Sequence, residues 1–351
     1  MAQEDPTDDT ATIEQGLTIR AIAEAAGVSV RTVSRVLNRS PKVNAETREA
    51  VQAVIDRTGF SPSLRARALA VGRSSLIGLV HDDPNALVLD PVQRGVVATC
   101  VARGYEMIVH PVSGAGDALI DDVAHFVRRS RVDGLVVLPP VSELAQLPVA
   151  LAPLRVPVIG LAAVRTPSYR AMIVTDERAA AALVADHFVS LGHRRIAIVT
   201  GRESAMSSGE RAAGFRAALA AAGIDLPESM VVSGDYGFDS GVAAAHVLLS
   251  RADPPTAIFA SNDVMAAGVL NVATSLGIAV PRQLSVAGFD GSLIARMLSP
   301  TLTTIARPMR DMARIAAERL IDMIEHPSAK GGVDTAFSLT LAIGHSTGPV
   351  A

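Results

Sequence analysis

The sequence predicts a small all-α domain followed by a larger α/β domain with two lobes, each built on a doubly wound parallel sheet. Three observations carry this prediction. Three short amphipathic helices fit into some 45 residues near the start of the chain, and basic charge is concentrated in the same segment. Beyond residue 75, two successive sets of apolar strands alternate with helical stretches. A length of 351 residues suits one small domain plus one two-lobed domain.

The composition indicates a globular protein of the cytoplasm. The chain is 49% hydrophobic and 19% charged, and no uncharged apolar run approaches the roughly 18 to 20 residues of a membrane span. Residues 1–16 hold five acidic side chains and no Lys or Arg, unlike a signal peptide, and read as a disordered acidic tail. The single cysteine, Cys100, excludes an internal disulfide and a multi-cysteine zinc site. We expect no membrane association, no cofactor and no metal.

The charge is distributed unevenly along the chain. The net charge is −3, but residues 17–73 contain ten Lys or Arg against four Asp or Glu, a net +6. The tail before this segment carries −5 and the chain after it carries −4. A cationic module on an otherwise acidic chain indicates polyanion binding, although a solvated surface is an alternative.

Residues 17–61 have the spacing of a helix-turn-helix domain. Ala23 is small enough for two helices to cross closely, Gly27 permits a tight turn, and Ser29 can cap a second helix from Val30 to about Asn38. A third helix is expected from a cap at Asn44 to Gly59. The side chains expected on the exposed face of the second helix are Val30, Arg31, Ser34, Arg35 and Asn38.

Such a helix fits the major groove of DNA. There Arg can donate two hydrogen bonds to guanine, and Ser, Thr or Asn can reach phosphates or base edges. An ordinary helical hairpin is the alternative. Residues 62–74 are expected to form a further short helix, about Leu64 to Ala70, and a linker.

Residues 75–351 show the strand and helix alternation of parallel sheets. The expected strands are Leu76–Val80, Glu106–His110, Gly134–Leu138 and Val156–Leu161 in a first set, and Ile196–Thr200, Met230–Ser233, Ala257–Ala260 and Leu284–Phe289 in a second. We expect an N-lobe of about 75–161 and 292–325, and a C-lobe of about 162–291 and 326–351. A ligand should bind between the lobes, at the carboxyl ends of the strands.

Several motifs occur in the same order as in a known family. They are Val-Ser-Arg-Val-Leu-Asn at 33–38, Ala-Glu-Thr-Arg at 45–48, Arg-Val-Asp-Gly-Leu at 131–135, Leu-Gly-His-Arg-Arg-Ile at 191–196, Ser-Asn-Asp-Val-Met-Ala at 261–266, Ser-Val-Ala-Gly-Phe-Asp at 285–290 and Pro-Thr-Leu-Thr-Thr-Ile at 300–305. Over residues 17 to about 348 the chain resembles the lactose-repressor and galactose-repressor (LacI/GalR) family of bacterial transcriptional regulators. The resemblance implies a periplasmic-binding-protein-like effector domain, a homodimer, a palindromic double-stranded operator, and release from it by a small sugar-like effector.

The resemblance also implies DNA-contacting roles. Val30, Arg31 and Arg35 would read bases. Contacts to the DNA backbone, or their support, would come from Thr18, Ser29, Thr32, Ser34, Asn38, Asn44 and Thr47. The segment after Pro62 would be a hinge helix whose Leu69 wedges into the minor groove, a step that kinks the duplex. Packing of Leu69 on its own domain is the alternative.

The implied effector site lies between the lobes. Arg211, Asn262 and Asp290 match residues that bind ligand hydroxyl groups, and Tyr236 is a candidate lid or stacking ring. Asp82, Asp83 and Asn85 would face the cleft from the other lobe, or would form an acidic surface loop.

Three features depart from the family pattern. Asn85-Ala86-Leu87-Val88 lacks the aromatic residues that many relatives carry there, and Ala162 replaces a charged ligand contact. Ala21 stands at a commonly acidic position of the first helix. The usual contact set for a monosaccharide is therefore incomplete.

Two other functions are compatible with parts of the sequence. A non-regulatory sugar-binding protein would share the two-lobed fold but would have no use for residues 17–73. An enzyme could use Asp176, His193 and Cys100, but the sequence shows no nucleophile–base pattern and no Gly-rich phosphate loop. The sequence therefore favours a DNA-binding repressor without enzymatic activity.

Overall fold

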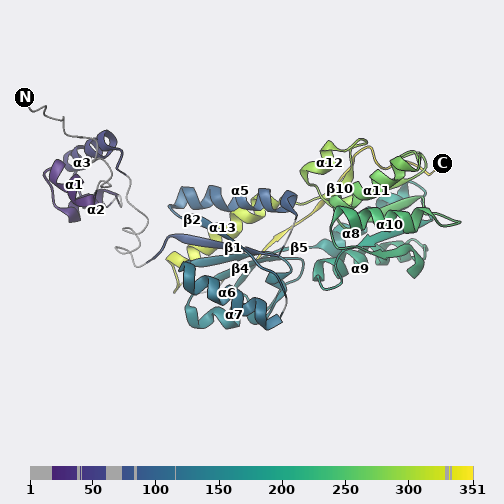
Figure 1. The fold of residues 1–351 in the computed structure, drawn as a ribbon, viewed down its shortest axis with the longest axis horizontal. Coiled ribbons are helices and arrows are strands. Elements are labelled where there is room, and N and C mark those ends of the chain that lie inside the picture. The colour runs from purple at the N-terminus through teal and green to yellow at the C-terminus, as the bar shows by residue number, and fades with distance from the viewer. Residues whose placement is uncertain are drawn as a thin grey trace, which may run out of the picture. The chain divides into compact units, whose positions relative to one another are not determined.

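The computed structural model describes residues 18–37, 40, 42–60, 73–82, 85–114, 116–328, 332 and 334–350 (Figure 1). The chain divides into an N-terminal unit within Met1–Ser74 and a C-terminal unit of Ser75–Ala351. The expected hinge helix and its Leu69, like Asn38 in the expected recognition helix, lie outside the described residues. No helix in the described part of the chain combines the length and the apolar character needed to cross a bilayer.

The N-terminal unit consists of three helices, α1 (Ile19–Ala25), α2 (Val30–Leu37) and α3 (Ala45–Thr58). Each forms where the sequence predicts it. The turn between α1 and α2 uses Gly27 at φ +65°, and Gly59 ends α3 in the same left-handed conformation. The core of this unit is formed by Ile22, Ala23, Val33, Val36, Val43, Val51, Val54 and Phe60.

The N-lobe of the C-terminal unit is built on a six-stranded, all-parallel sheet. Its order is β11 (Thr335–Phe337), β5 (Ala171–Thr175), β4 (Val158–Ala162), β3 (Gly134–Val137), β1 (Leu76–His81) and β2 (Glu106–Pro111). Helices α5 (Ala86–Arg103) and α13 (Met309–Glu325) cover one face, and α6 (Gly116–Ser130) and α7 (Gln146–Leu151) cover the other (Figure 1). Gly95 permits the close approach of α5 to α13, because a Cβ there would lie 2.3 Å from the Arg310 carbonyl oxygen.

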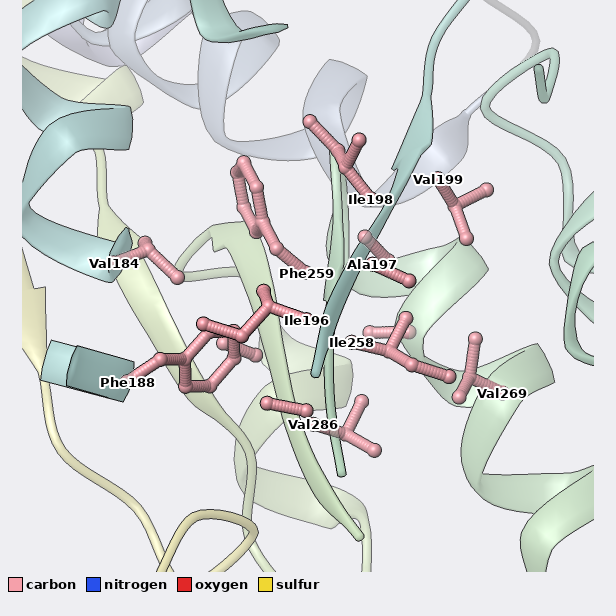
Figure 2. Packing of buried hydrophobic residues seen from close by; sticks show 14 of the residues in the cluster. Val184, Phe188, Ile196, Ala197, Ile198, Val199, Ile258, Phe259, Val269 and Val286 are labelled. Carbon is pink, nitrogen blue, oxygen red and sulfur yellow. The ribbon is translucent and has the colours of Figure 1, made fainter. Parts of the chain in front are cut away.

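The C-lobe is built on a second six-stranded sheet, in which only the edge strand β12 is antiparallel. Its order is β12 (Thr340–Ala342), β10 (Thr303–Ala306), β9 (Ser285–Asp290), β8 (Ala257–Ala260), β6 (Ile196–Thr200) and β7 (Val231–Ser233). Its helices are α8 (Glu177–Ser190), α9 (Met206–Ala221), α10 (Phe238–Leu249), α11 (Asp263–Ser275) and the short α12 (Leu293–Met297). Figure 2 shows the buried core, in which Phe188 and Phe259 pack with Ile196 and Val286 of the central strands.

The expected lobe boundaries are wrong at three places. β5 pairs within the N-lobe sheet although 162–291 was assigned to the C-lobe, and β10 pairs within the C-lobe sheet although 292–325 was assigned to the N-lobe. β11 also pairs within the N-lobe sheet although 326–351 was assigned to the C-lobe. The physical reason is that these strands are only three to five residues long. The hydropathy of such a short segment can indicate that it forms a strand. It does not indicate which of the two sheets the strand joins, because that depends on tertiary pairing.

Candidate DNA-recognition surface and ligand cleft

Helix α2 presents a polar and cationic face that is opposite its buried face. Val33 and Val36 are buried in the core, whereas Val30 is 42% exposed and Arg31 is exposed. Ser34 and Arg35 are half-buried on the same side as Val30 and Arg31. These are four of the five side chains that the sequence places on the recognition face; the fifth, Asn38, lies outside the described residues.

The predicted caps Ser29 and Asn44 occupy helix starts, and Thr18 caps α1 in the same way. Ser29 Oγ accepts a hydrogen bond from Thr32 N at 3.1 Å and lies 2.9 Å from Thr32 Oγ1. Thr18 Oγ1 accepts from Ala21 N at 3.3 Å, and Asn44 Oδ1 accepts from Thr47 N at 2.9 Å. The sequence-predicted set Thr18, Ser29, Thr32, Asn44 and Thr47 therefore stabilises the first turns of α1, α2 and α3.

The electrostatics of this unit suit a polyanion. No ion pair forms among the described residues between 18 and 60, so no carboxylate of these residues neutralises the positive charge of Arg31 and Arg35. Arg48 donates instead to the carbonyl oxygens of Ser40 and Val43, at 2.9 and 3.1 Å.

In the C-terminal unit, one cleft is lined by all six predicted ligand residues. It encloses about 730 Å³ of space open to solvent. Asp82 and Asn85 line it from the N-lobe, and Arg211, Tyr236, Asn262 and Asp290 line it from the C-lobe. The side chains converge because Asp82 follows β1, Asn262 follows β8 and Asp290 ends β9, and the carboxyl ends of parallel strands meet at one edge of each sheet. Asp83 lies outside the described residues.

The floor of the cleft is a buried cluster of two arginines and two carboxylates, Arg211, Arg307, Glu177 and Asp290, here called the ionic cluster. Arg211 Nε donates to Glu177 Oε2 at 2.7 Å, and Arg307 Nη2 lies 3.3 Å from Glu177 Oε1. Arg307 Nη1 donates to Asp290 Oδ1 at 3.0 Å, and Arg211 Nη2 lies 3.9 Å from the same oxygen. Every side chain of the cluster is at least nine-tenths buried.

Further contacts hold Arg211 in place. Its guanidinium stacks over the Phe289 ring at 3.7 Å and donates to the Ser261 carbonyl oxygen. Burial alone would raise the pKa of Glu177, but the charges of Arg211 and Arg307 outweigh burial and lower it. Glu177 therefore stays ionised between its two cations.

Two residues of the cleft have backbone conformations that side chains rarely adopt. Asp290 has φ +112° and Tyr236 has φ +74°. Asn262 helps to hold Tyr236, because its Nδ2 donates to the Tyr236 carbonyl oxygen at 2.9 Å while its Oδ1 caps α11 at Met265 N, 2.8 Å away. Strained residues persist where their surroundings over-determine them, and they concentrate at ligand-binding sites.

Asp263 lies next to the ionic cluster, and its neighbours are hydrogen-bond donors. Oδ1 accepts from Thr304 Oγ1 at 2.5 Å, and Oδ2 accepts from Ser292 N and Oγ at 2.7 and 2.8 Å. Burial and the nearby charge of Asp290 raise the pKa of Asp263 to about 7.

The N-lobe side of the cleft is mainly apolar. Val88, Leu138, Pro139, Pro140 and Met309 line it, and this set is called the apolar wall. Tyr236 is the only aromatic residue among the described residues that line the cleft, in agreement with the missing stacking platform expected at residues 85–88.

Two polar contacts join the lobes beside the cleft. Arg202 Nη1 lies 3.2 Å from Asp82 Oδ2, and Met206 N at the start of α9 donates to Glu143 Oε2 at 3.0 Å. Sequence reasoning missed Glu143, Glu177, Arg202 and Arg307. Arg202 and Glu177 each lie two residues after a strand, and this position could have identified them as cleft residues. The position of Arg307 at the cleft could not be predicted in this way, because it follows β10, a strand that was assigned to the wrong lobe.

The residues considered for an enzyme have structural contacts. Asp176 Oδ1 caps α8 by accepting from Ala179 N at 2.9 Å. His193 is buried, with its ring nitrogens 3.0 Å from Thr256 Oγ1 and Ser285 Oγ. Cys100 is buried in the N-lobe core, and burial raises the pKa of its thiol to about 12.

A cationic helix-turn-helix unit joined to a two-lobed ligand-binding unit defines a ligand-responsive DNA-binding regulator. Residues 18–63 match the model described as bacterial regulatory proteins, lacI family, and residues 185–347 match the periplasmic binding protein-like domain. The chain is 31% identical to catabolite control protein A of Priestia megaterium, over 87% of this chain and 91% of that protein. It is 33% identical to the HTH-type transcriptional regulator CelR of Thermobifida fusca, over 88% and 92%.

Solved structures show the same architecture. The lac repressor dimer bound to operator and the anti-inducer ONPF matches with a TM-score of 0.82 and 28% identity, covering 96% of this chain and all of that chain. The CelR–cellobiose complex matches with a TM-score of 0.69 and 29% identity, covering 94% and 99%. The chain therefore belongs to the lacI family of bacterial regulatory proteins. It is a DNA-binding transcriptional regulator, and the relatives named here are regulators rather than enzymes.

Proposed function

We propose that this regulator is a cytoplasmic repressor that binds a palindromic operator as a homodimer and releases it when a small sugar-like effector closes the two lobes. The proposal that a sugar-like effector binds in the cleft is carried by one observation, a neighbouring hydrogen-bond donor and acceptor that no other described side chain uses. Among the described residues, Arg211 Nη2 and Asp290 Oδ2 have no hydrogen-bond partner. A hydroxyl group accepts and donates at once, so a polyol uses both.

The DNA part rests on the exposed face of α2. Val30, Arg31 and Arg35 are the proposed base-reading residues, since an arginine can donate two hydrogen bonds to guanine in the major groove. The capping residues Thr18, Ser29 and Asn44, with Thr32, Ser34 and Thr47, are proposed to support the backbone contacts, because helix starts offer N–H groups to phosphates. Asn38 and Leu69 stay in the proposed set on the resemblance alone.

Two relatives support the proposal that this chain binds both operator DNA and a sugar. The lac repressor structure is described as a dimer bound to operator, and the CelR structure as a cellobiose complex. If both partners bind this chain, their effects are reciprocal. Effector and operator should weaken each other's binding by the same factor, typically about 5- to 150-fold.

The test begins with selection of a palindromic site from a random DNA library by the full-length chain. Fluorescence anisotropy then measures the affinity for that site at several salt concentrations, with and without a panel of sugars. We expect a steep loss of affinity as salt rises and a further loss with one sugar class. Sugar binding without any salt-sensitive DNA preference would instead indicate a non-regulatory binding protein.

A further inference from the structure

Residues 1–16, here called the acidic tail, and the segment that follows them carry nearly opposite charges. The acidic tail holds five Asp or Glu and no Lys or Arg, a net −5, whereas residues 17–73 carry a net +6. The lacI family model matches residues 18–63, so the tail precedes the segment shared with that family. The tail lies outside the described residues, and the proposed operator contacts do not use it. Its charge makes it a second polyanion for the basic unit, besides DNA.

Helix α2 offers positive charge to which carboxylates can bind. Arg31 is exposed and Arg35 is half-buried, and neither forms an ion pair with a described residue. The first turn of α2 contains no acidic residue, so the partial positive charge of the helix start adds to that of Arg31. The exposed Arg20 lies two residues after Thr18, where the tail joins the unit. Positive charge is therefore available both at the attachment point of the tail and on α2.

The acidic tail is long enough to reach α2. An extended chain spans about 3.3 Å per residue, so Asp5 can lie up to about 43 Å from Thr18. A domain of the size of residues 18–60 has a radius of gyration of only about 9 Å. Because the tail is tethered to this unit, its carboxylates act at an effective concentration in the millimolar range, at which even weak contacts form.

Resting on the proposed recognition face, we propose that the acidic tail docks on the exposed face of α2 and competes with DNA for it. Carboxylates of the tail bind Arg31, Arg35 and the helix start, and phosphates displace them when DNA binds. The competition lowers the affinity for every DNA sequence by the same factor, because the tail has to leave before any duplex can bind. It thereby reduces the fraction of the regulator that is held on non-specific DNA.

The first experiment compares two full-length variants that lose the same number of negative charges. The tail variant carries Glu4→Gln, Asp5→Asn, Asp8→Asn, Asp9→Asn and Glu14→Gln. The control variant changes exposed aspartates of the C-terminal unit and carries Asp117→Asn, Asp121→Asn, Asp186→Asn, Asp225→Asn and Asp253→Asn. Fluorescence anisotropy measures the affinity of both variants and of the unaltered chain for the selected operator and for an unrelated duplex.

At about 50 mM salt the tail variant should bind both duplexes about five- to tenfold tighter than the unaltered chain. This gain corresponds to the loss of two or three exposed ion pairs that each contribute about two- to threefold. It should fall below about twofold near 300 mM salt, because salt screens exposed charges. The control variant should gain less than about twofold at either concentration. No gain in the tail variant, an equal gain in the control variant, or a gain that does not change with salt would overturn the proposal.

A second experiment locates the docked tail in the absence of DNA. Gln3→Cys allows a fluorophore to be attached to the tail of the full-length chain. The native Cys100 does not compete for the fluorophore, because it is buried and the pKa of its thiol is raised to about 12. Anisotropy of the attached fluorophore at about 50 mM salt reports whether the tail is held on the protein.

A matched pair of variants then tests the placement on α2. Arg31→Gln should lower the anisotropy of the fluorophore, whereas Arg57→Gln, which removes an exposed charge from the last turn of α3, should leave it unchanged. An unchanged value in Arg31→Gln, or an equal fall in both variants, would contradict the placement. Because DNA is absent, this result does not depend on the proposed function. A chain that prefers no operator would fail as a repressor and could still hold its tail on α2.

Discussion

Arginine side chains define both functional regions of the molecule, but their surroundings differ. On α2, Arg31 is exposed and Arg35 is half-buried, and no ion pair forms among the described residues of the N-terminal unit. In the cleft, Arg211 and Arg307 are buried and shared between two carboxylates. The first arrangement leaves positive charge for a polyanion to neutralise. The second uses charge to hold hydrogen-bond donors and acceptors in fixed positions at the cleft.

The comparison shows that residue type alone does not assign a role to a basic side chain. An unpaired surface arginine adds to long-range attraction and salt-dependent affinity. A buried arginine held by two carboxylates adds no such field, but its removal leaves carboxylates without compensation. The following predictions test this difference, starting with the largest effect.

Arg211→Met should destabilise the C-terminal unit by about 3–5 kcal/mol, because it leaves a buried carboxylate short of one partner. The matched control is Arg178→Met. Arg178 forms a well-aligned pair with Glu210 at 2.8 Å, but its side chain is 58% exposed, so we expect a loss below about 1 kcal/mol. Urea unfolding of both variants measures the difference. Equal losses would show that burial does not separate the two pairs.

Arg35→Ala should weaken binding to the selected operator by about 1–3 kcal/mol and relax base preference at one position, as expected for loss of a bidentate contact. Arg57→Ala is the control, since it removes an exposed positive charge in the last turn of α3. It should reduce affinity for all sequences alike and leave the preference intact. Anisotropy against operator and single-base variants distinguishes these outcomes. If Arg35→Ala lowered the affinity for all sequences equally, Arg35 would not be a base-reading residue.

Asp263→Asn should stabilise the chain by about 1–2 kcal/mol at pH 8 and by less at pH 5. The pKa of Asp263 is raised to about 7 in the folded state, above its ordinary value. The protonated Asp263 side chain therefore contributes its full stabilisation of the folded state below about pH 4, and this contribution is lost as the pH rises through about 7. Asparagine mimics the protonated acid and removes this dependence. Thermal unfolding of both proteins from pH 5 to 8 measures it, and a constant difference across this range would contradict the raised pKa.

The sequence allowed good prediction of local features and poor prediction of lobe connectivity. Gly27, Ser29, Asn44 and Gly59 mark helix boundaries through backbone geometry and capping, which depend on a few neighbouring residues. The three crossings between lobes depend on which sheet accepts short strands such as β10. That choice is made by long-range pairing, and local hydropathy carries no information about it.

The same limit applies to the cleft. Arg211, Asn262 and Asp290 were placed by motif, and the structure brings them together at one set of strand ends. Glu177 and Arg307 were not foreseen, because their roles depend on a contact between the start of α8 and the segment after β10. A partner of a buried charge is identified only when the fold brings the two together.

The contact between Glu143 and the start of α9 should have the smallest effect. This carboxylate of the N-lobe accepts from Met206 N of the C-lobe, and burial raises its pKa, so its charge is only weakly favoured there. A charge at a helix start contributes about 0.3–1 kcal/mol, so Glu143→Gln should weaken effector binding about two- to fivefold by disfavouring lobe closure.

The control is Glu210→Gln. Glu210 lies on α9 itself but is paired within the C-lobe to Arg178, so its substitution should leave effector affinity unchanged. Calorimetry with the best-binding sugar measures both. Equal effects would mean that the contact between lobes does not favour closure, and a loss beyond about tenfold would exceed what a charge at a helix start contributes.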